Sequence, residues 1–230
     1  MCIRDSFTTG IGTGSFGLWN QHVKLEKRVG KHAFSLVQSI QRSDGYRENS
    51  ASQRIYLQAT ENWKYREDAE LRMLFFYSDL NYRTPGGLNL QQYNANPRAA
   101  RPATATLPGA AEQKAGIHNS TFFGGILHES QLTKTFRHVF ALFGSHTDFQ
   151  NPFITNYEKR LENSIGVRTF IEGRYELKEN LLLKINIGLE SQRTFSKLDN
   201  YENIFGNPGT LQDAATINLQ YGFVFTRITL

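Results

Sequence analysis

The connections between the strand-like segments of this chain alternate strictly between short and long. The short turns span residues 28–31, 66–68, 132–135 and 178–180, and the long segments span residues 42–54, 83–118, 147–163 and 194–215. Successive connections of an antiparallel sheet lie at opposite ends of the strands, so this order places every short turn at one end. Such sorting is typical of outer-membrane β-barrels, whereas soluble sandwiches and propellers have no reason to sort loops by length.

Period-two alternation predicts nine strands between these connections. They are expected at residues 15–27, 32–41, 55–65, 71–82, 121–131, 136–146, 165–177, 183–192 and 216–230. In the strongest pair, Ile165, Val167, Ile171, Ile185 and Ile187 face one way, while Arg168, Glu172, Arg174, Lys184 and Glu190 face the other. The last strand keeps Ile217, Leu219, Tyr221, Phe223 and Phe225 on one face. A charged face suits a water-filled lumen and would not suit a sandwich core.

The residue types at the strand ends also fit a bilayer. No run of eighteen apolar residues exists, which excludes a transmembrane helix, but strands of about 9–11 residues with one apolar face can span a membrane. The six prolines are Pro85, Pro97, Pro102, Pro108, Pro152 and Pro208, and all fall in predicted long segments. Apolar faces end near Trp63, Tyr65, Phe136, Tyr175 and Tyr77 or Tyr82, as interfacial girdles would, although ordinary core packing also explains aromatic residues.

Other function classes receive little support from the residues. The net charge of +5 is spread along the chain, which argues against nucleic acid as the main partner. Gly12, Gly14 and Gly17 match a dinucleotide-binding pattern, but a strand rather than a helix is expected after them, so a flexible entry to that strand is the alternative. The histidines lack zinc-site spacing and no nucleophile elbow occurs, so we expect no metal site, no catalytic residue and no enzymatic activity.

The two ends of the sequence are abrupt. The segment 1–6, which contains the single cysteine Cys2, resembles a translated sequencing adapter. We therefore expect residues 7–230 to be an internal part of a longer barrel and the start at Met1 to be artificial. The last residues, 220–230, continue a strand pattern without a stop signal.

The segment 81–102 contains the most concentrated set of turn-forming and polar residues. Thr84, Pro85, Gly86 and Gly87 predict a sharp bend, because proline presets φ for the first central position of a turn and Gly86 can adopt the positive φ needed at the second. The candidate ligand contacts around this bend are Tyr82, Arg83, Gln91, Tyr93, Asn96, Arg98 and Arg101.

Charge makes this long segment a candidate for capturing an anion. Arg83, Arg98, Arg101 and Lys114 oppose a lone Glu112, and arginine can hold an anionic chelate with two hydrogen bonds. The alternative is that Arg98 and Arg101 contact lipopolysaccharide or carboxylates of neighbouring loops. The turn formed by Asp44, Gly45, Tyr46 and Arg47 is expected to brace the larger loop rather than contact ligand.

Three runs carry a resemblance to a known family. They are SDGYRENSASQR at 43–54, FFYSDLNYRTPGGLNLQQYNANPRAARP at 75–102 and AEQKAGIHNSTFFGGILHE at 111–129. Together they resemble the barrel of TonB-dependent outer-membrane receptors of the ferric citrate and siderophore group. The resemblance implies a partial all-β, antiparallel transmembrane barrel, with about nine of 22 strands present and the N-terminal plug and its TonB-binding box lying outside the sequence.

The function implied by this resemblance is import of a ferric chelate across the bacterial outer membrane with energy from the TonB system. The implied partners are outer-membrane lipid, lipopolysaccharide, the chelate and, through the plug, the TonB complex; no cofactor is expected, since iron would enter only within the chelate. Uptake of cobalamin or a glycan, a passive or adhesive barrel, and a secreted carbohydrate-binding β-protein remain alternatives.

Overall fold

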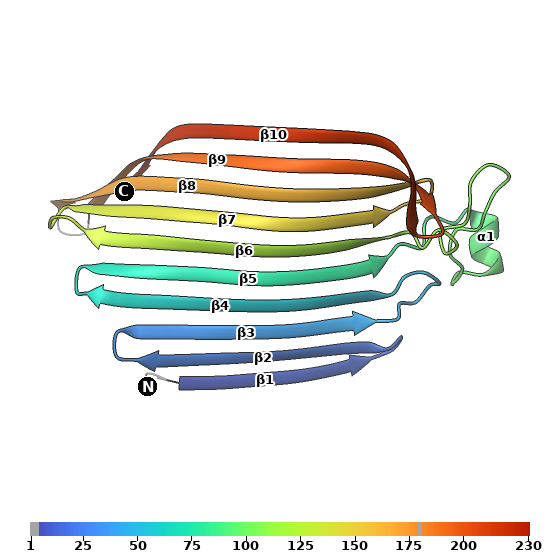
Figure 1. Cartoon of the computed structure of the whole chain (residues 1–230). Helices are drawn as coiled ribbons and strands as arrows, with labels where there is room; N and C mark the ends of the chain where they lie inside the picture. The colour runs from blue at the N-terminus through green and yellow to red at the C-terminus, as the bar shows by residue number, and fades with distance from the viewer. Residues whose placement is uncertain (1–4, 179–180) are drawn as a thin grey trace.

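A computed structural model describes residues 5–178 and 181–230, and these form one antiparallel sheet (Figure 1). Its ten strands follow one another in chain order: β1 (Asp5–Gly14), β2 (Leu18–Val29), β3 (His32–Ser43), β4 (Ser52–Arg66), β5 (Ala69–Arg83), β6 (Gly116–Gln131), β7 (Phe136–Pro152), β8 (Asn156–Lys178), β9 (Leu181–Ile204) and β10 (Asn207–Thr229). A short helix, α1 (Leu90–Ala95), lies between β5 and β6. Within these residues no helix is both long and apolar enough to cross a membrane.

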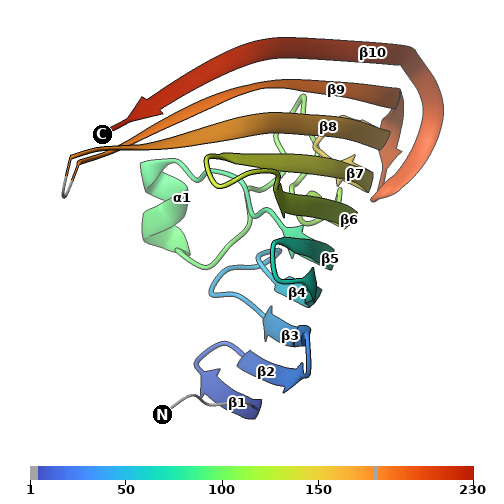
Figure 2. The same ribbon diagram turned by 90° about the vertical axis from the view of Figure 1, so that its left-hand side faces the viewer.

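The sheet curls across its width into an open arc, with β1 and β10 as its edges (Figure 2). Each strand pairs only with its neighbours in sequence, so every connection is a hairpin or a loop between adjacent strands. The predicted short turns at 28–31, 66–68 and 132–135 lie together at one end and α1 lies at the opposite end (Figure 1); of the predicted turn 178–180, residues 179–180 lie outside the described range. The antiparallel barrel-type sheet is therefore confirmed, whereas at the end with α1 only the connections 44–51 and 84–115 are long.

The glycine-rich beginning of the chain differs from the expectation of a flexible entry. Residues Asp5–Gly14 form a tenth strand, β1, which pairs with β2 along its whole length. The ring of His22 lies over Gly10, since a Cβ at this position would lie 2.2 Å from Cε1 of His22. A tight turn with positive φ at Phe16 and Gly17 leads into β2, so the element after the glycines is a strand and the dinucleotide reading is wrong. Of the predicted adapter segment 1–6, residues 1–4 lie outside the described range.

Two of the four predicted long loops are extended hairpins. Strands β7 and β8 continue through most of 147–163, and β9 and β10 continue through most of 194–215. Pro152 ends β7 and Pro208 lies near the start of β10, so the expectation that all prolines lie outside strands is wrong for these two. Both prolines lie beside a hairpin tip, where a missing amide proton disturbs little of the ladder.

The two faces of the arc differ in chemistry as the alternation predicts. One face carries exposed apolar side chains, including Leu142, Ile165 and Ile187, whose exposed fractions are 45%, 56% and 58%. The opposite face carries Arg137, which bonds Glu129 at 2.5 Å and Glu172 at 3.1 Å. Glu172 is only 6% exposed. Side chains crowd together on the inside of a curved sheet, so this charged face is the concave wall.

Strand β10 departs from that pattern. Its register with β9 shifts by one residue twice, between Pro208 and Leu211 and again between Leu211 and Asp213. Each one-residue shift moves the following side chains to the other face, so the second shift restores the orientation that the strand has beside the hairpin tip. The predicted apolar set therefore does share one face, but Phe223 pairs with Glu190 and faces the concave wall rather than the apolar outer face.

Candidate functional site

The long connections at one end of the sheet form a single packed structure. We call it the loop cluster; it comprises residues 44–51, residues 84–115 and the hairpin tips 153–155 and 205–206. Its small core contains the buried Ala100, Ala110 and Ala115, against which Ile154 packs. The cluster thus joins parts of the chain that are far apart in sequence, at the end of the arc where α1 lies (Figure 1).

The bend after β5 returns the long loop onto itself. Gly86 has a φ of +72°, the positive value predicted for it, and Pro85 O accepts a hydrogen bond from Arg101 N at 2.7 Å. A Cβ on Gly86 would lie 2.9 Å from the Cβ of Arg101. Thr84 N donates to Ala115 O at 2.9 Å, which closes the base of the loop. Glycine at position 86 is therefore required both by the positive φ and by the lack of space for a Cβ.

The loop 44–51 fastens the long loop to the sheet. Asn49 Nδ2 donates to Thr84 O and to Ala115 O, each at 2.9 Å. Asn49 itself is left-handed, with a φ of +53°, a conformation that asparagine adopts more readily than most residues. Beside it, Glu48 N donates to Arg98 O at 2.8 Å and Glu48 Oε2 accepts from Ala100 N at 3.2 Å.

The residues proposed to brace the loop occupy the same interface. Arg47 donates from Nε and Nη2 to Ala99 O at 3.1 and 2.8 Å. The Tyr46 ring meets the Phe16 ring edge to face at 5.3 Å, and Asp44 N donates to Phe16 O at 2.8 Å. Gly45 has a φ of +80°. Asp44, Tyr46 and Arg47 therefore contact the long loop or the β1–β2 turn, and the role of all four residues toward a ligand stays a prediction.

The tips of both long hairpins are tied to the other side of the loop. Asn203 Nδ2 donates to Gln113 O at 3.0 Å and also to Phe153 O. Gln113 Oε1 accepts a hydrogen bond from Phe205 N at 3.1 Å. Because Gln113 and Asn203 are both buried, these contacts hold the loop against β8 and β9 with little water between them.

The arginines proposed as anion contacts are already engaged within the cluster. Arg83 Nη1 donates to Lys114 O at 2.5 Å, and Arg101 Nη2 donates to Pro108 O. The guanidinium of Arg98 lies 5.2 Å from the centre of the Tyr46 ring and 5.8 Å from that of Phe16. Each arginine therefore stabilises the loop, and an incoming anion would compete with these contacts.

The pKa of Tyr157, near the start of β8, is affected by charged groups beside the loop cluster. Burial raises the pKa of the Tyr157 hydroxyl; Asp148 raises it further and Arg83 opposes the rise. The hydroxyl donates to Gln150 Oε1 at 2.8 Å. Tyr157 therefore stays a neutral hydrogen-bond donor beside the loop cluster.

Helix α1 is the part of the long loop with the least support from the rest of the protein. It contains no buried residue, and Leu90 and Tyr93 are 75% and 56% exposed. Gln91 is exposed as well. Asn96 ends the helix, and its side chain accepts a hydrogen bond from Arg98 N at 3.0 Å. Figure 2 shows α1 on the concave side of the arc.

The remaining candidates lie apart from this helix. Tyr82 is in β5, where it pairs with Ser52 and Ile117. Gly87 lies between the bend and α1, and a Cβ there would meet open space. The structure thus leaves Gln91 and Tyr93 exposed on α1, places the exposed Asn96 and Arg98 and the half-buried Arg101 in the segment after the helix, and leaves Tyr82 and Arg83 at the sheet.

Glu48, Asn49, Gln113 and Asn203 hold the cluster together and were not singled out by the sequence. A signal existed for Asn49, because an asparagine within a short polar segment favours turns and left-handed backbone. Gln113 and Asn203 lie 90 positions apart, so only the folded sheet brings them together.

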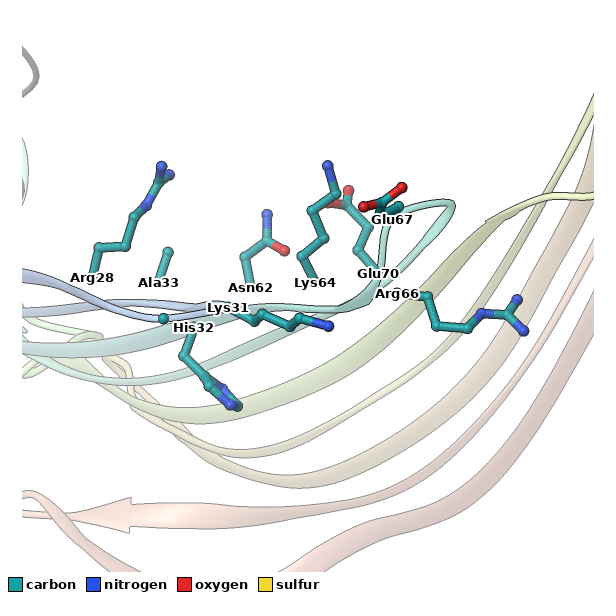
Figure 3. Close-up of a pocket in the computed structure, with 10 residues that line it drawn as sticks. Arg28, Lys31, His32, Ala33, Asn62, Lys64, Arg66, Glu67 and Glu70 are labelled. Carbon is teal, nitrogen blue, oxygen red and sulfur yellow. The ribbon is translucent and has the colours of Figure 1, made fainter. Parts of the chain in front are cut away.

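A hollow lies at the opposite end of the sheet from the loop cluster, beside the short turns. It has a volume of about 470 Å³ and lies beside the turns after β2 and β4. Figure 3 shows Arg28, Lys64, Glu67 and Glu70 extending to one side of the strands, whereas His32 points away. Its charges are mixed, and the described residues contain no group of three side chains able to hold a metal ion.

Solved structures provide the comparisons for this architecture. No protein-family model and no curated protein matches the sequence. The unliganded ferric citrate transporter FecA matches with a TM-score of 0.70 and 14% identity, over 98% of this chain and 35% of FecA. Pyoverdine-bound FpvA of P. aeruginosa matches with a TM-score of 0.73 and 10% identity, over 98% and 37%. The ferric-catecholate import receptor Fiu of E. coli K12 matches with 0.67 and 10%, over 97% and 41%.

The matches cover nearly all of this chain but only a part of each receptor. The chain spans between 35% and 41% of the length of these three proteins. At 10–14% identity such likeness concerns the fold alone. The chain therefore has the fold of a section of the β-barrel of TonB-dependent outer-membrane receptors.

Proposed function

We propose that this chain is part of an outer-membrane receptor that binds a ferric chelate and imports it with energy from the TonB system. The observation that carries the proposal is the ordered loop cluster at one end of an arc whose concave wall is charged. Long loops held by a rigid scaffold are suited to capturing a scarce solute, and a charged wall keeps the lumen wet.

The comparisons support the same class of function. The matched structures include a ferric citrate transporter, FpvA in complex with a pyoverdine and iron, and a ferric-catecholate import receptor. These neighbours are transport proteins, which favours a role without catalysis. Each of these neighbours is named for, or bound to, iron in chelated form, in keeping with a protein that handles a whole chelate rather than the bare ion.

The outer face favours a membrane protein over a secreted carbohydrate-binding protein. Apolar side chains along β3 to β9 stay exposed there, including Leu36, Leu57, Phe122, Leu142, Ile165 and Ile187. A surface of this extent needs to be covered, and lipid covers it in a barrel. Outer-membrane lipid, lipopolysaccharide and the TonB complex are accordingly the proposed partners.

Iron uptake by the full-length protein tests the proposal. The complete gene would be expressed in a strain that lacks its own ferric-chelate receptors, and uptake of radioactive iron would be measured with and without TonB. We expect uptake of at least one chelate that requires TonB. Uptake without TonB would indicate a passive barrel, and TonB-dependent uptake of cobalamin or a glycan in place of iron would replace the ferric chelate as the substrate.

A further inference from the structure

Helix α1 presents an apolar surface that the fold does not use. Leu90 and Tyr93 are three positions apart and so lie on one face of the helix. Both are largely exposed, and α1 buries no residue of its own. An isolated helix of six residues is too short to be stable in water without help. The sequence therefore maintains a helix whose apolar pair is available to something else.

The ends of α1 show what keeps the helix formed. Asn89 Oδ1 accepts a hydrogen bond from Gln92 N at 2.9 Å, and Gln92 Oε1 accepts one from Asn89 N at 3.0 Å. This reciprocal cap satisfies two amide groups that the first turn would leave free. The cap fixes the direction of Leu90 and Tyr93 without covering them.

The sequence around this surface carries no charge. Residues 88–97 read LNLQQYNANP and contain no acidic or basic side chain. The nearest arginine in sequence, Arg98, lies on the rings of Phe16 and Tyr46. Of the other cations, Arg83 and Arg101 donate to backbone carbonyls, and the Lys114 stem runs along Gly206 at the tip of the last hairpin.

We propose that Leu90 and Tyr93 contact an uncharged, carbon-rich part of the imported chelate, while the amides of Gln91 and Asn94 bind its carbonyl or hydroxyl oxygens. This inference rests on the proposed function and names the substrate class. An iron(III) tris-hydroxamate fits, because three singly charged ligand groups cancel the charge of the metal. Tris-catecholate and citrate complexes keep negative charge and would need free cations, which α1 does not offer.

Binding by the full-length protein in detergent tests this assignment. Titration calorimetry would use a ferric tris-hydroxamate, a ferric tris-catecholate and ferric citrate, each at about 0.05 and 0.5 M NaCl, because salt screens contacts between exposed charges. We expect the tris-hydroxamate to bind best, with a Kd that changes less than about twofold between the two salt concentrations.

Substitutions distinguish a contribution of α1 to binding from a contribution of the rest of the loop. Leu90→Ser combined with Tyr93→Ser should raise the Kd of the tris-hydroxamate by about tenfold or more, since an aromatic and an aliphatic contact are lost together. Leu107→Ser is the matched control, because Leu107 is a 43% exposed leucine in the same loop, and it should leave the Kd unchanged. Protection of the Arg101 amide from hydrogen exchange checks that the loop stays folded.

The outcomes distinguish this inference from the proposed function. A wild-type protein that binds a chelate while the α1 double variant binds it equally well would overturn the role of α1. A preference for an anionic chelate, together with a strong salt dependence and a loss of affinity in Arg98→Gln, would overturn the uncharged class. A change in oligomeric state with an unchanged Kd would assign the surface to a second copy instead. Failure of the wild type to bind any chelate would remove the proposed function itself.

Discussion

Replacing Asn49 with alanine should release the long loop from the end of the sheet while leaving the strands intact. Asn49 Nδ2 makes two 2.9 Å hydrogen bonds to the carbonyls of Thr84 and Ala115, each worth about 1 kcal/mol net. Alanine at the observed φ of +53° adds about 1 kcal/mol of backbone strain. The free energy of loop opening should therefore fall by about 3 kcal/mol, which is on the order of a hundredfold in the opening equilibrium.

Amide hydrogen exchange on the full-length protein in detergent measures this opening. The informative amides are those of Thr84, Arg101 and Ala110, which donate to carbonyls within the loop at 2.7–2.9 Å. Asn49→Gly separates the two contributions, because glycine tolerates the positive φ and loses only the side-chain bonds. It should accelerate exchange by about 30-fold, corresponding to about 2 kcal/mol.

A control and a refuting result follow from the same design. Asn94→Ala removes an exposed asparagine from α1 and should leave exchange at Arg101 unchanged. Amides in the middle of β5 should be unaffected in every variant. If Asn49→Ala leaves the loop amides as protected as in the wild type, Asn49 does not hold the loop and the packing of Ala100 and Ala110 is sufficient.

Three further substitutions test other parts of the structure. Gly86→Ala should destabilise the bend by about 1–2 kcal/mol, because alanine is strained at a φ of +72° and its Cβ meets Arg101; loop exchange should rise while the melting temperature of the barrel stays constant. Asn203→Ala should free the tip of the last hairpin, so the Phe205 amide should exchange faster. If Asn203 acts only within β9, the exchange rate of the Phe205 amide should not rise. Arg137→Met should lower stability to urea by about 2 kcal/mol, less than for a fully buried pair because Arg137 is 22% exposed, and Arg137→Lys should recover part of the loss.

The order of the strands and their two faces could be predicted because those signals are local. Alternation of side chains along 165–192 reports directly which residues share a face. The order of the connections places successive turns at opposite ends of the antiparallel sheet. The hairpin extensions were missed for the opposite reason: beyond the apolar band both faces are polar, as at Glu158 and Lys159, so the period-two signal disappears while the backbone pairing continues.

The two register shifts in β10 show a second limit. They lie before residue 217 and leave the apolar alternation of 217–225 intact, so the sequence still predicts one shared face. Which side of the sheet that face meets depends on the pairing register with β9, which alternation alone does not reveal. Alternation thus predicts relative orientation within a strand, and pairing with β9 decides the absolute orientation.

Charge composition was the weakest guide to the candidate site. Counting Arg83, Arg98 and Arg101 describes the loop as basic, but two of these arginines donate to backbone carbonyls and the third lies against aromatic rings. Every peptide unit offers a carbonyl oxygen, so a sequence cannot show whether an arginine is free for an anion or held by its own loop.

This distinction decides how the loop should respond to salt. A free arginine attracts an anionic solute over roughly a Debye length, about 8 Å at physiological ionic strength, so binding through it weakens as salt rises. Arg98 instead rests on Phe16 and Tyr46, and moving it to a solute would give up contacts worth roughly 1 kcal/mol. Uncharged contacts at Leu90 and Tyr93 neither weaken as salt rises nor require Arg98 to leave its aromatic partners. A Kd that stays constant across salt concentrations would therefore place recognition on α1, and a steep rise of Kd with salt would return it to the arginines.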